Sequence, residues 1–459
     1  MKHFYFILLF LIVNLSVKAQ EAEETPLDTL TRSVSSLQQN FEANNRLRIS
    51  GYIQGQFQVA EASGEASFEG GSFASGVYQR FMIRRGRVKL NYTGPSNDKG
   101  YTLNNYMLQM DFTEKGVRLM DAYARFTDPW LGAFSLTVGL QNRPFGYEVP
   151  YSSSFRESPE RGRMSQLLFP NERDLGAMLT MQGAKISNWH WIKFDIGIFN
   201  GKSTPNVNTD ASESDNKKDI ITHLSIARSN KVETIKYGLG LSYYNGGIRI
   251  DSVDVYSMNT DPITLVPSFR QDSKKIDNYH GGIVGSRSNT KREYIGADFQ
   301  FTYGGSAGIT VFRAEYIQGK QPGITTIDQP WFDTRSPIVS TLSTKDIYNR
   351  NFNGAYFYLI QNILQSPFQL VVKYDWYDPN TDVKRNQIGS TITSANFKAT
   401  SPSDLRYDTW GFGTIIHMDA GIKLMIYYDI PKNEKSVHLQ NYKSDVKDNV
   451  LTLRLQSTF

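Results

Sequence analysis

From Arg46 to the last residue, apolar and polar side chains alternate along this chain with a period of two. In the segment 188–200, for example, Ile192 and Phe194 share one side, whereas Lys193 lies on the other. Such alternation is typical of β-strands with one apolar and one polar face. It predicts sixteen strands, at approximately 46–58, 79–91, 101–113, 116–127, 131–141, 173–183, 190–200, 219–229, 233–244, 291–303, 307–317, 350–361, 367–377, 404–417, 420–430 and 448–459.

The connections between these strands alternate in length, with long segments after odd strands and short turns after even ones. The single exception is Glu114-Lys115, a short link after the third strand; the long connections include 245–290, 318–349 and 378–403. Outer-membrane barrels have short periplasmic turns, long external loops and an even strand number. The sequence therefore predicts an all-β fold, a 16-stranded antiparallel transmembrane β-barrel in the outer membrane of a Gram-negative-type bacterium.

The composition excludes several other classes of protein. A mean hydropathy of −0.42 over 459 residues is too polar for a bundle of membrane helices. The chain has no cysteine, which excludes disulfide scaffolds, thiolate metal sites and cysteine nucleophiles. Its 50 lysines and arginines are spread among 45 acidic residues without a basic block, so we expect no nucleic-acid partner. We also expect no cofactor and no metal.

The first 45 residues differ from the rest of the chain. Residues 1–19 combine Lys2 with an apolar run and a small-x-small end at Ala19, the pattern of a signal peptide. Residues 20–45 form a polar periplasmic extension in which apolar residues recur at spacings of three and four. This spacing indicates either a short helical coiled coil or a solvated linker. The barrel domain is predicted to be 46–459.

The last predicted strand ends on an aromatic residue. Leu451, Leu453, Leu455 and Phe459 share one face of it. A terminal phenylalanine that closes an alternating strand looks like the signal read by the outer-membrane assembly machinery. We therefore expect Phe459 to contact that machinery.

Two stretches resemble a known family, the phosphate-selective porins O and P. They are Val138-Gly139-Leu140-Gln141-Asn142-Arg143-Pro144-Phe145-Gly146-Tyr147-Glu148 and Phe169-Pro170-Asn171-Glu172-Arg173-Asp174-Leu175-Gly176. The arginine-bearing strand near Arg84 to Leu90 is similar as well. The resemblance implies a homotrimer of 16-stranded channels, each constricted by an infolded third loop. The chain departs from the family in selectivity, because the arginines and the lysine of its phosphate site are not all matched.

The predicted third loop, 142–172, carries both signs of charge. Its four prolines stiffen a long excursion, which favours folding into the lumen over an exposed position where the charges are merely solvated. Inside the lumen, facing rows of opposite charge would orient polar solutes. The loop residues concerned are Arg143, Arg156, Arg161, Arg163, Glu148, Glu157 and Glu160.

The alternation also assigns the polar wall of the lumen, where ten cations face seven anions and indicate a weak anion preference. Arg84 and Arg85 are adjacent, so both face inward only with a bulge. We predict that Arg85, Arg87 and Arg143 form one basic side of the constriction. The pore-lining and anion-binding residues are predicted to be Arg85, Arg87, Lys89, Arg125, Arg143, Arg156, Arg161, Arg163 and Lys373, with Asp121, Glu148 and Glu157 as the acidic constriction residues.

These features predict a porin that allows passive diffusion of small hydrophilic solutes, with a weak preference for anions, including phosphate. Its expected partners are membrane lipid, further copies of itself in a homotrimer, and small anionic or polar solutes. The alternative is a barrel that serves as a surface adhesin or houses a lumenal hydrolase. No G-x-S-x-G or H-E-x-x-H motif accompanies the histidines and serines, which favours a channel over an enzyme.

Overall fold

The computed structural model describes residues 46–170, 172–184, 187–201, 218–251, 254–272, 287–323, 346–418 and 421–459. The predicted signal peptide, 1–19, and the predicted extension, 20–45, lie outside these residues. Within the described ranges, nineteen strands form a single sheet. Sixteen of them make up the barrel, and the other three lie among the external loops.

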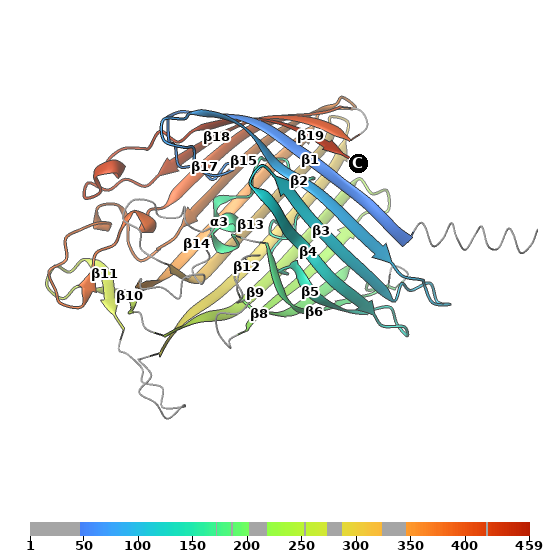
Figure 1. The fold of residues 1–459 in the computed structure, drawn as a ribbon, viewed down its shortest axis with the longest axis horizontal. Helices are drawn as coiled ribbons and strands as arrows, with labels where there is room; N and C mark the ends of the chain where they lie inside the picture. Colours follow the sequence, from blue (N-terminus) through green and yellow to red (C-terminus); the bar gives the residue numbers. More distant parts are fainter. Residues whose placement is uncertain are drawn as a thin grey trace, which may run out of the picture. The chain divides into compact units, whose positions relative to one another are not determined.

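The sixteen barrel strands coincide with the predicted ones to within a few residues at most ends. Each is antiparallel to its neighbour, and β1 closes the barrel by pairing with β19 from Tyr52↔Thr458 to Ala60↔Val450 (Figure 1). The predicted 16-stranded barrel is confirmed. The strands are β1 (Leu47–Ala60), β2 (Gln79–Thr93), β3 (Asn104–Thr113), β4 (Gly116–Thr127), β5 (Phe134–Asn142), β6 (Arg173–Gln182), β7 (Ile192–Phe199), β8 (Asp219–Ser229), β9 (Ile235–Asp251), β12 (Arg287–Gly305), β13 (Gly308–Gly323), β14 (Ile347–Asn362), β15 (Phe368–Asp378), β17 (Tyr407–His417), β18 (Ile422–Asn433) and β19 (Val450–Thr458).

Three short strands in the long connections were not predicted. They are β10 (Val255–Thr260), β11 (Pro267–Gln271) and β16 (Phe397–Lys398). The first two form a hairpin at the loop-bearing end of the barrel (Figure 1), where β10 runs parallel to the first residues of β14. Short strands without regular alternation carry little signal in the sequence, so only the pairing with β14 reveals them.

The helices of the described residues are short. α3 (Arg163–Leu168) belongs to the third loop, and η2 (Arg385–Gln387), η3 (Pro402–Asp404) and η4 (Gln440–Tyr442) belong to external loops. Among the residues that the structure describes, none of the helices is long and apolar enough to cross a membrane.

Side chains alternate between the lumen and the outside as predicted, and the aromatic residues at the strand ends follow this alternation. Tyr243 and Tyr244 are neighbours, so they point to opposite faces: Tyr244 is buried in the lumen, whereas the hydroxyl of Tyr243 reaches Glu293 on the outer face. Tyr377 and Tyr427 are buried in the lumen as well. Neighbouring aromatic residues at strand ends are therefore divided between the lumen and the outer face of the barrel.

The C-terminal residue lies at the closure of the barrel. The backbone N–H of Phe459 donates to the Gly51 carbonyl at 3.0 Å, and the N–H of Gly51 donates back at 2.9 Å. The Phe459 side chain is 63% exposed, so it is accessible to a partner. Its role in assembly stays a prediction.

Candidate functional site

The loop 143–172, between β5 and β6, lies inside the barrel and places α3 in the lumen (Figure 1). Its backbone reaches the wall formed by the first and last strands. The Ser153 carbonyl accepts from Gln54 Nε2 at 3.1 Å, the Ser154 carbonyl from Lys423 Nζ at 2.8 Å, and the Pro159 carbonyl from Arg454 Nη1 at 2.6 Å. The predicted infolding of the third loop is confirmed.

The first turn of the loop fixes its direction into the lumen. Gly146 has a φ of 61°, and a side chain at this position would overlap the Glu315 carboxylate. A glycine is needed here because other residues rarely adopt this backbone conformation. The backbone N–H groups of Tyr147 and Glu148 both donate to Glu315 Oε2 at 3.1 Å, and that of Gly146 donates to Ser242 Oγ at 2.9 Å.

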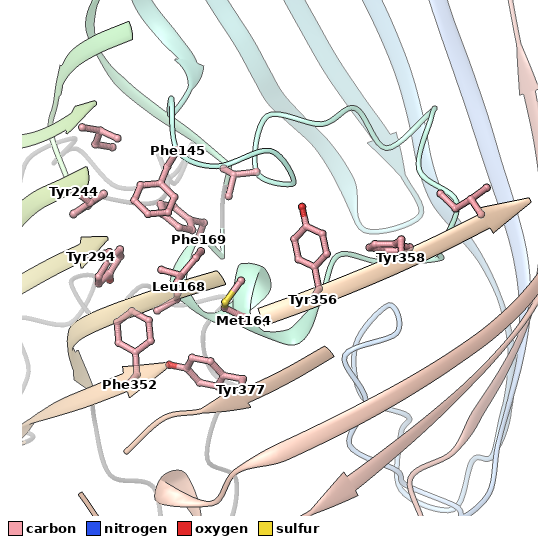
Figure 2. Packing of buried hydrophobic residues seen from close by; sticks show 14 of the residues in the cluster. Phe145, Met164, Leu168, Phe169, Tyr244, Tyr294, Phe352, Tyr356, Tyr358 and Tyr377 are labelled. Carbon is pink, nitrogen blue, oxygen red and sulfur yellow. The ribbon is translucent and has the colours of Figure 1, made fainter. Parts of the chain in front are cut away.

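An aromatic cluster packs the loop against β9, β12 and β14 (Figure 2). Phe145 and Phe169, from the two ends of the loop, have ring centroids 5.0 Å apart. They meet the Tyr244 and Tyr294 rings, which are stacked 4.8 Å apart, and Tyr294 lies 5.2 Å from Phe352. All five side chains are almost fully buried. This side of the lumen is therefore closed by an apolar core.

Glu148 closes the loop upon itself and is not exposed to the lumen. Its carboxylate accepts the Gly162 backbone N–H at 3.0 and 3.1 Å and the Tyr358 hydroxyl at 3.2 Å. The predicted constriction residue is thus a cross-link between the start of the loop, the segment before α3 and β14. Only 3% of Glu148 is exposed.

Glu160 fastens the loop to β2 and β19. Its carboxylate lies 2.7 Å from Arg84, 2.8 Å from Arg85 and 3.1 Å from Arg454, and Arg156 is 4.0 Å away. Burial raises the pKa of Glu160, but these arginines outweigh it and hold the pKa well below its usual range. An ionised carboxylate surrounded by guanidinium groups is the main electrostatic anchor of the loop.

The side chains of Arg84 and Arg85 both contact Glu160, although the two residues are adjacent in β2. Two adjacent residues of a strand face the same side only where the strand contains a β-bulge, as predicted above. Gln56 Nε2 donates to Met82 Sδ at 3.0 Å, which places Met82 inside the lumen, and Arg87 is inside as well. Strict alternation would put residues 82 and 87 on opposite faces. One residue between them is therefore out of alternation.

The remaining predicted residues of the loop also contact protein. Glu157 pairs with Arg313 at 2.7 Å, and Arg161 lies 3.5 Å from Glu172. The other cations are placed as follows: Arg163 lies over the Tyr407 ring at 3.8 Å and the Phe68 ring at 4.5 Å, and Arg143 lies over the Phe169 ring at 5.1 Å with none of its surface exposed. The structure thus differs from the predicted facing rows of loop charges, and it places Arg143 at the aromatic cluster instead of beside Arg85 and Arg87.

Lys373, predicted to line the pore from β15, is likewise enclosed. It is 2% exposed and lies 2.9 Å from Asp375. The Asp375 carboxylate also receives the Arg163 backbone N–H, at 3.4 Å. Lys373 therefore belongs to the closed part of the lumen together with α3.

A polar cavity of about 160 Å³ remains between the loop and the wall of β2, β3, β4 and β6. Three cations and two carboxylates line it, with tyrosine, serine and amide side chains between them. We name this space the eyelet cavity. Its residues include Arg87, Lys89, Gln109, Asp121, Tyr123, Asn142, Tyr151, Ser152, Ser153, Glu172 and Arg173.

The strand register places these charges in rows across the wall. Arg87 is opposite Asp111, which is opposite Arg118; Lys89 is opposite Gln109, which is opposite Asp121. Because opposite residues of neighbouring strands share a face, each row points into the lumen. The register thus places Arg87, Lys89 and Asp121 on the lumen side of the wall. Whether they bind anions stays a prediction.

The charged side chains of the eyelet cavity differ in whether a side chain of opposite charge lies close to them. Arg173 lies 2.9 Å from Asp121 and 3.3 Å from Glu172, and Arg87 lies 3.3 Å from Asp111. Burial raises the pKa of Glu172, but Arg161, Arg173 and Arg87 hold it well below its usual range, so this carboxylate is ionised. Among the described residues, the Lys89 ammonium forms no ion pair.

Arg125, the last of the predicted residues, stands beside the eyelet cavity on β4. Its Nε donates to Thr137 Oγ1 at 3.1 Å, and its guanidinium lies 5.9 Å from the Tyr123 ring centre. It has no carboxylate partner among the described residues. Sequence reasoning missed Arg173 and Glu172 as lining residues, although both belong to the stretch that carries the family resemblance.

Comparison with family profiles and with curated proteins finds no match to this chain. Among solved structures, the chain is similar to the outer membrane channel DcaP of Acinetobacter baumannii, with 11% identity and a TM-score of 0.50 over 90% of this chain and 97% of that chain. It is also similar to Pseudomonas putida OprB in a high pH structure, with 10% identity and a TM-score of 0.53 over 93% and 97%. A closed barrel with an apolar outer face is how a sheet crosses a bilayer. The chain is an outer-membrane β-barrel with the porin fold.

Proposed function

We propose that this chain is a channel for passive diffusion of small hydrophilic solutes, with a weak preference for anions. The eyelet cavity carries the proposal, because the infolded loop fills the opposite side of the lumen with apolar side chains and leaves polar ones here. A water-filled path lined by charges and hydroxyls suits polar solutes that do not need to be recognised in detail.

The preference for anions rests on the charges that have no counter-charge. Arg87 and Arg173 face carboxylates, whereas Lys89 and Arg125 pair with none in the part of the chain that the structure describes. A small excess of positive charge favours anions without holding them, and conduction requires such weak binding. Phosphate selection, which the family resemblance implies, would need more arginines, but those of the third loop pack against protein. We therefore include phosphate only as one small anion among others.

The homotrimer and the assembly role of Phe459 remain part of the proposal. Light scattering of the purified protein in detergent micelles would give the mass of the assembly.

Replacing Phe459 by Ala is expected to lower the amount of barrel in the membrane more than its stability, because burial of one such side chain contributes about 1.5–3 kcal/mol. Unchanged membrane levels would contradict the assembly role.

Planar-bilayer recording of the purified chain tests the proposed channel. We expect stepwise conductance and, in a chloride gradient, a reversal potential on the anion side; replacing chloride by phosphate should preserve its sign. Lys89→Glu should move the reversal potential toward cation preference, whereas Lys435→Glu, on an exposed external loop, should not. An absence of conductance steps, or a Lys89→Glu channel with the parental reversal potential, would contradict the proposal.

A further inference from the structure

An apolar hollow of about 450 Å³ lies on the outer face of the barrel, over β8, β9 and β12 to β15. Its floor consists of Ala297, Ala314 and Ala355. Each alanine stands between large side chains of the neighbouring strands; Ala314, for example, is opposite both Phe299 and Phe357. A small residue between two rings leaves a gap in an otherwise continuous apolar surface.

A second hollow, of mixed polar and apolar lining and about 620 Å³ in volume, lies on β12, β13 and β14 nearer the external loops, beneath the β10–β11 hairpin. Lys291 and Lys320 line it, together with Asn349, Asn351 and the Asp382 carboxylate. Both lysines are exposed, and among the described residues neither forms an ion pair. The hollow therefore offers two ammonium groups to a ligand.

The strand register shows that both hollows are on the outer face. Lys320 is opposite Glu293, while the next residue pair, Gly319 and Tyr294, belongs to the lumen side, where Tyr294 is buried in the aromatic cluster. Lys291 precedes Glu293 by two residues and so shares its face. The Glu293 carboxylate already accepts the Tyr243 hydroxyl at 3.1 Å, and Asp382 accepts from Asn351 at 2.8 Å.

The distance between the two hollows along the membrane normal matches half the thickness of the hydrocarbon layer. Lys291 and Ala297 are six residues apart on β12, as are Lys320 and Ala314 on β13. Six residues of strand span about 20 Å, which the tilt of barrel strands reduces to about 15 Å along the membrane normal. Half of the hydrocarbon layer is also about 15 Å. Ala297 lies eight residues from Gly305, where β12 ends at the short turn, so the alanines lie near the middle of the membrane and the lysines at its outer surface.

We propose that one lipid of the outer leaflet with a net negative, phosphate-bearing headgroup occupies both hollows, with an acyl chain over the alanines and its phosphate between Lys291 and Lys320. The charge of the lysines and the apolar floor, at the separation of a headgroup and its chain, point to the same occupant. Free phosphate would meet only the lysines. A second copy of the chain would cover the apolar floor without needing them.

Native mass spectrometry of the full-length chain in detergent micelles tests this site. The probes are phosphatidylglycerol and phosphatidylcholine with identical dimyristoyl chains, and inorganic phosphate. We expect one phosphatidylglycerol per chain, retained about thirtyfold better than phosphatidylcholine, as two lysines near an anionic headgroup allow. Lys291→Gln combined with Lys320→Gln should abolish this preference, whereas Lys435→Gln should preserve it. Inorganic phosphate should not displace the lipid.

The apolar half of the site has its own variant. Ala314→Phe fills the floor and should lower retention of both lipids, while the barrel continues to assemble because the new ring faces lipid. Equal retention of the two lipids by the parent chain, or displacement by inorganic phosphate, would overturn the proposal. So would an Ala314→Phe chain with normal lipid retention and an altered oligomeric mass, which would assign the hollow to a second copy. None of these measurements depends on conductance, so they test the lipid site independently of the proposed channel.

Discussion

The two sides of the lumen are built from opposite kinds of side chain. Against β9, β12 and β14 the third loop forms an aromatic core around Phe145 and Phe169, and against β2 to β4 it leaves the polar eyelet cavity. A barrel of sixteen strands is too wide for wall side chains alone to fill. The difference teaches that most of the loop fills and narrows the lumen, whereas one edge of it borders the eyelet cavity.

The same difference explains why the charges of the loop are poor candidates for selectivity. A loop inside a barrel needs anchors on several strands, and here Glu160, Glu157 and Glu148 supply them. The cations that line the eyelet cavity, Arg87, Lys89 and Arg173, come from strands of the wall instead. We propose that selectivity and loop attachment are functions of different residues.

The largest difference between the two sides of the lumen is expected when lysine is replaced by glutamine, once on each side. Lys373→Gln, on the closed side, removes the partner of the buried Asp375 and should cost about 3–5 kcal/mol of stability without moving the reversal potential. Lys89→Gln, in the eyelet cavity, should change stability by less than about 0.5 kcal/mol and shift the reversal potential toward cations. Urea unfolding in detergent and bilayer recording measure the two effects. Equal effects of the two substitutions on stability and on the reversal potential would contradict this difference between the two sides of the lumen.

The aromatic core gives the next prediction. Phe169→Ala should destabilise the barrel by about 3–5 kcal/mol, the usual range for removing a buried ring. Because the loop loses its contact with Tyr244 and Tyr294, the conductance of each channel should also rise and become noisier. Exposed Phe81→Ala, on the outer face of β2, serves as the control and should leave the conductance unchanged. A parental conductance in Phe169→Ala would show that the loop is held without this cluster.

Removing the charge of Glu160 should have a smaller effect. Glu160→Gln keeps the shape of the side chain, and its amide oxygen still accepts hydrogen bonds from the arginines that now contact Glu160, so we expect a loss of about 1.5–3 kcal/mol in all. We expect a lower urea midpoint and an increased anion preference, because the arginines lose their counter-charge. An unchanged anion/cation ratio would mean that this cluster is shielded from the path.

The smallest predicted effect is the pH dependence of the first external loop, 61–78. Burial raises the pKa of Glu65 to about 7, and burial likewise raises the pKa of Asp448, on the neighbouring external segment, to about 7. A carboxyl whose pKa is raised in the folded state stabilises that state below its ordinary pKa and loses this contribution as the pH rises toward 7. The protection factors of residues 61–78, which correct hydrogen exchange for its base-catalysed rise with pH, should therefore be lower at about pH 8 than at about pH 5. Combining Glu65→Gln with Asp448→Asn should remove the difference, and its persistence would exclude these groups.

The sequence by itself determined the strands, their number and the face on which each wall residue lies. Alternation with a period of two is a local property, and a bilayer allows a polar chain without membrane helices few solutions other than a closed barrel. That is why Lys89 and Asp121 could be assigned to the lumen side of the wall, whereas the infolding of the third loop was predicted from its four prolines and from the family resemblance.

Only the tertiary structure decided which charges face the path. The partners of the loop come from strands far away in the chain: Glu160 meets Arg85 and Arg454, and Arg143 meets Phe169 across the whole loop. Nothing in the spacing of these residues distinguishes an anchoring arginine from one exposed to water. Their roles follow from close packing and from the need to neutralise buried charge, and both depend on contacts that form only when the barrel closes around its loop.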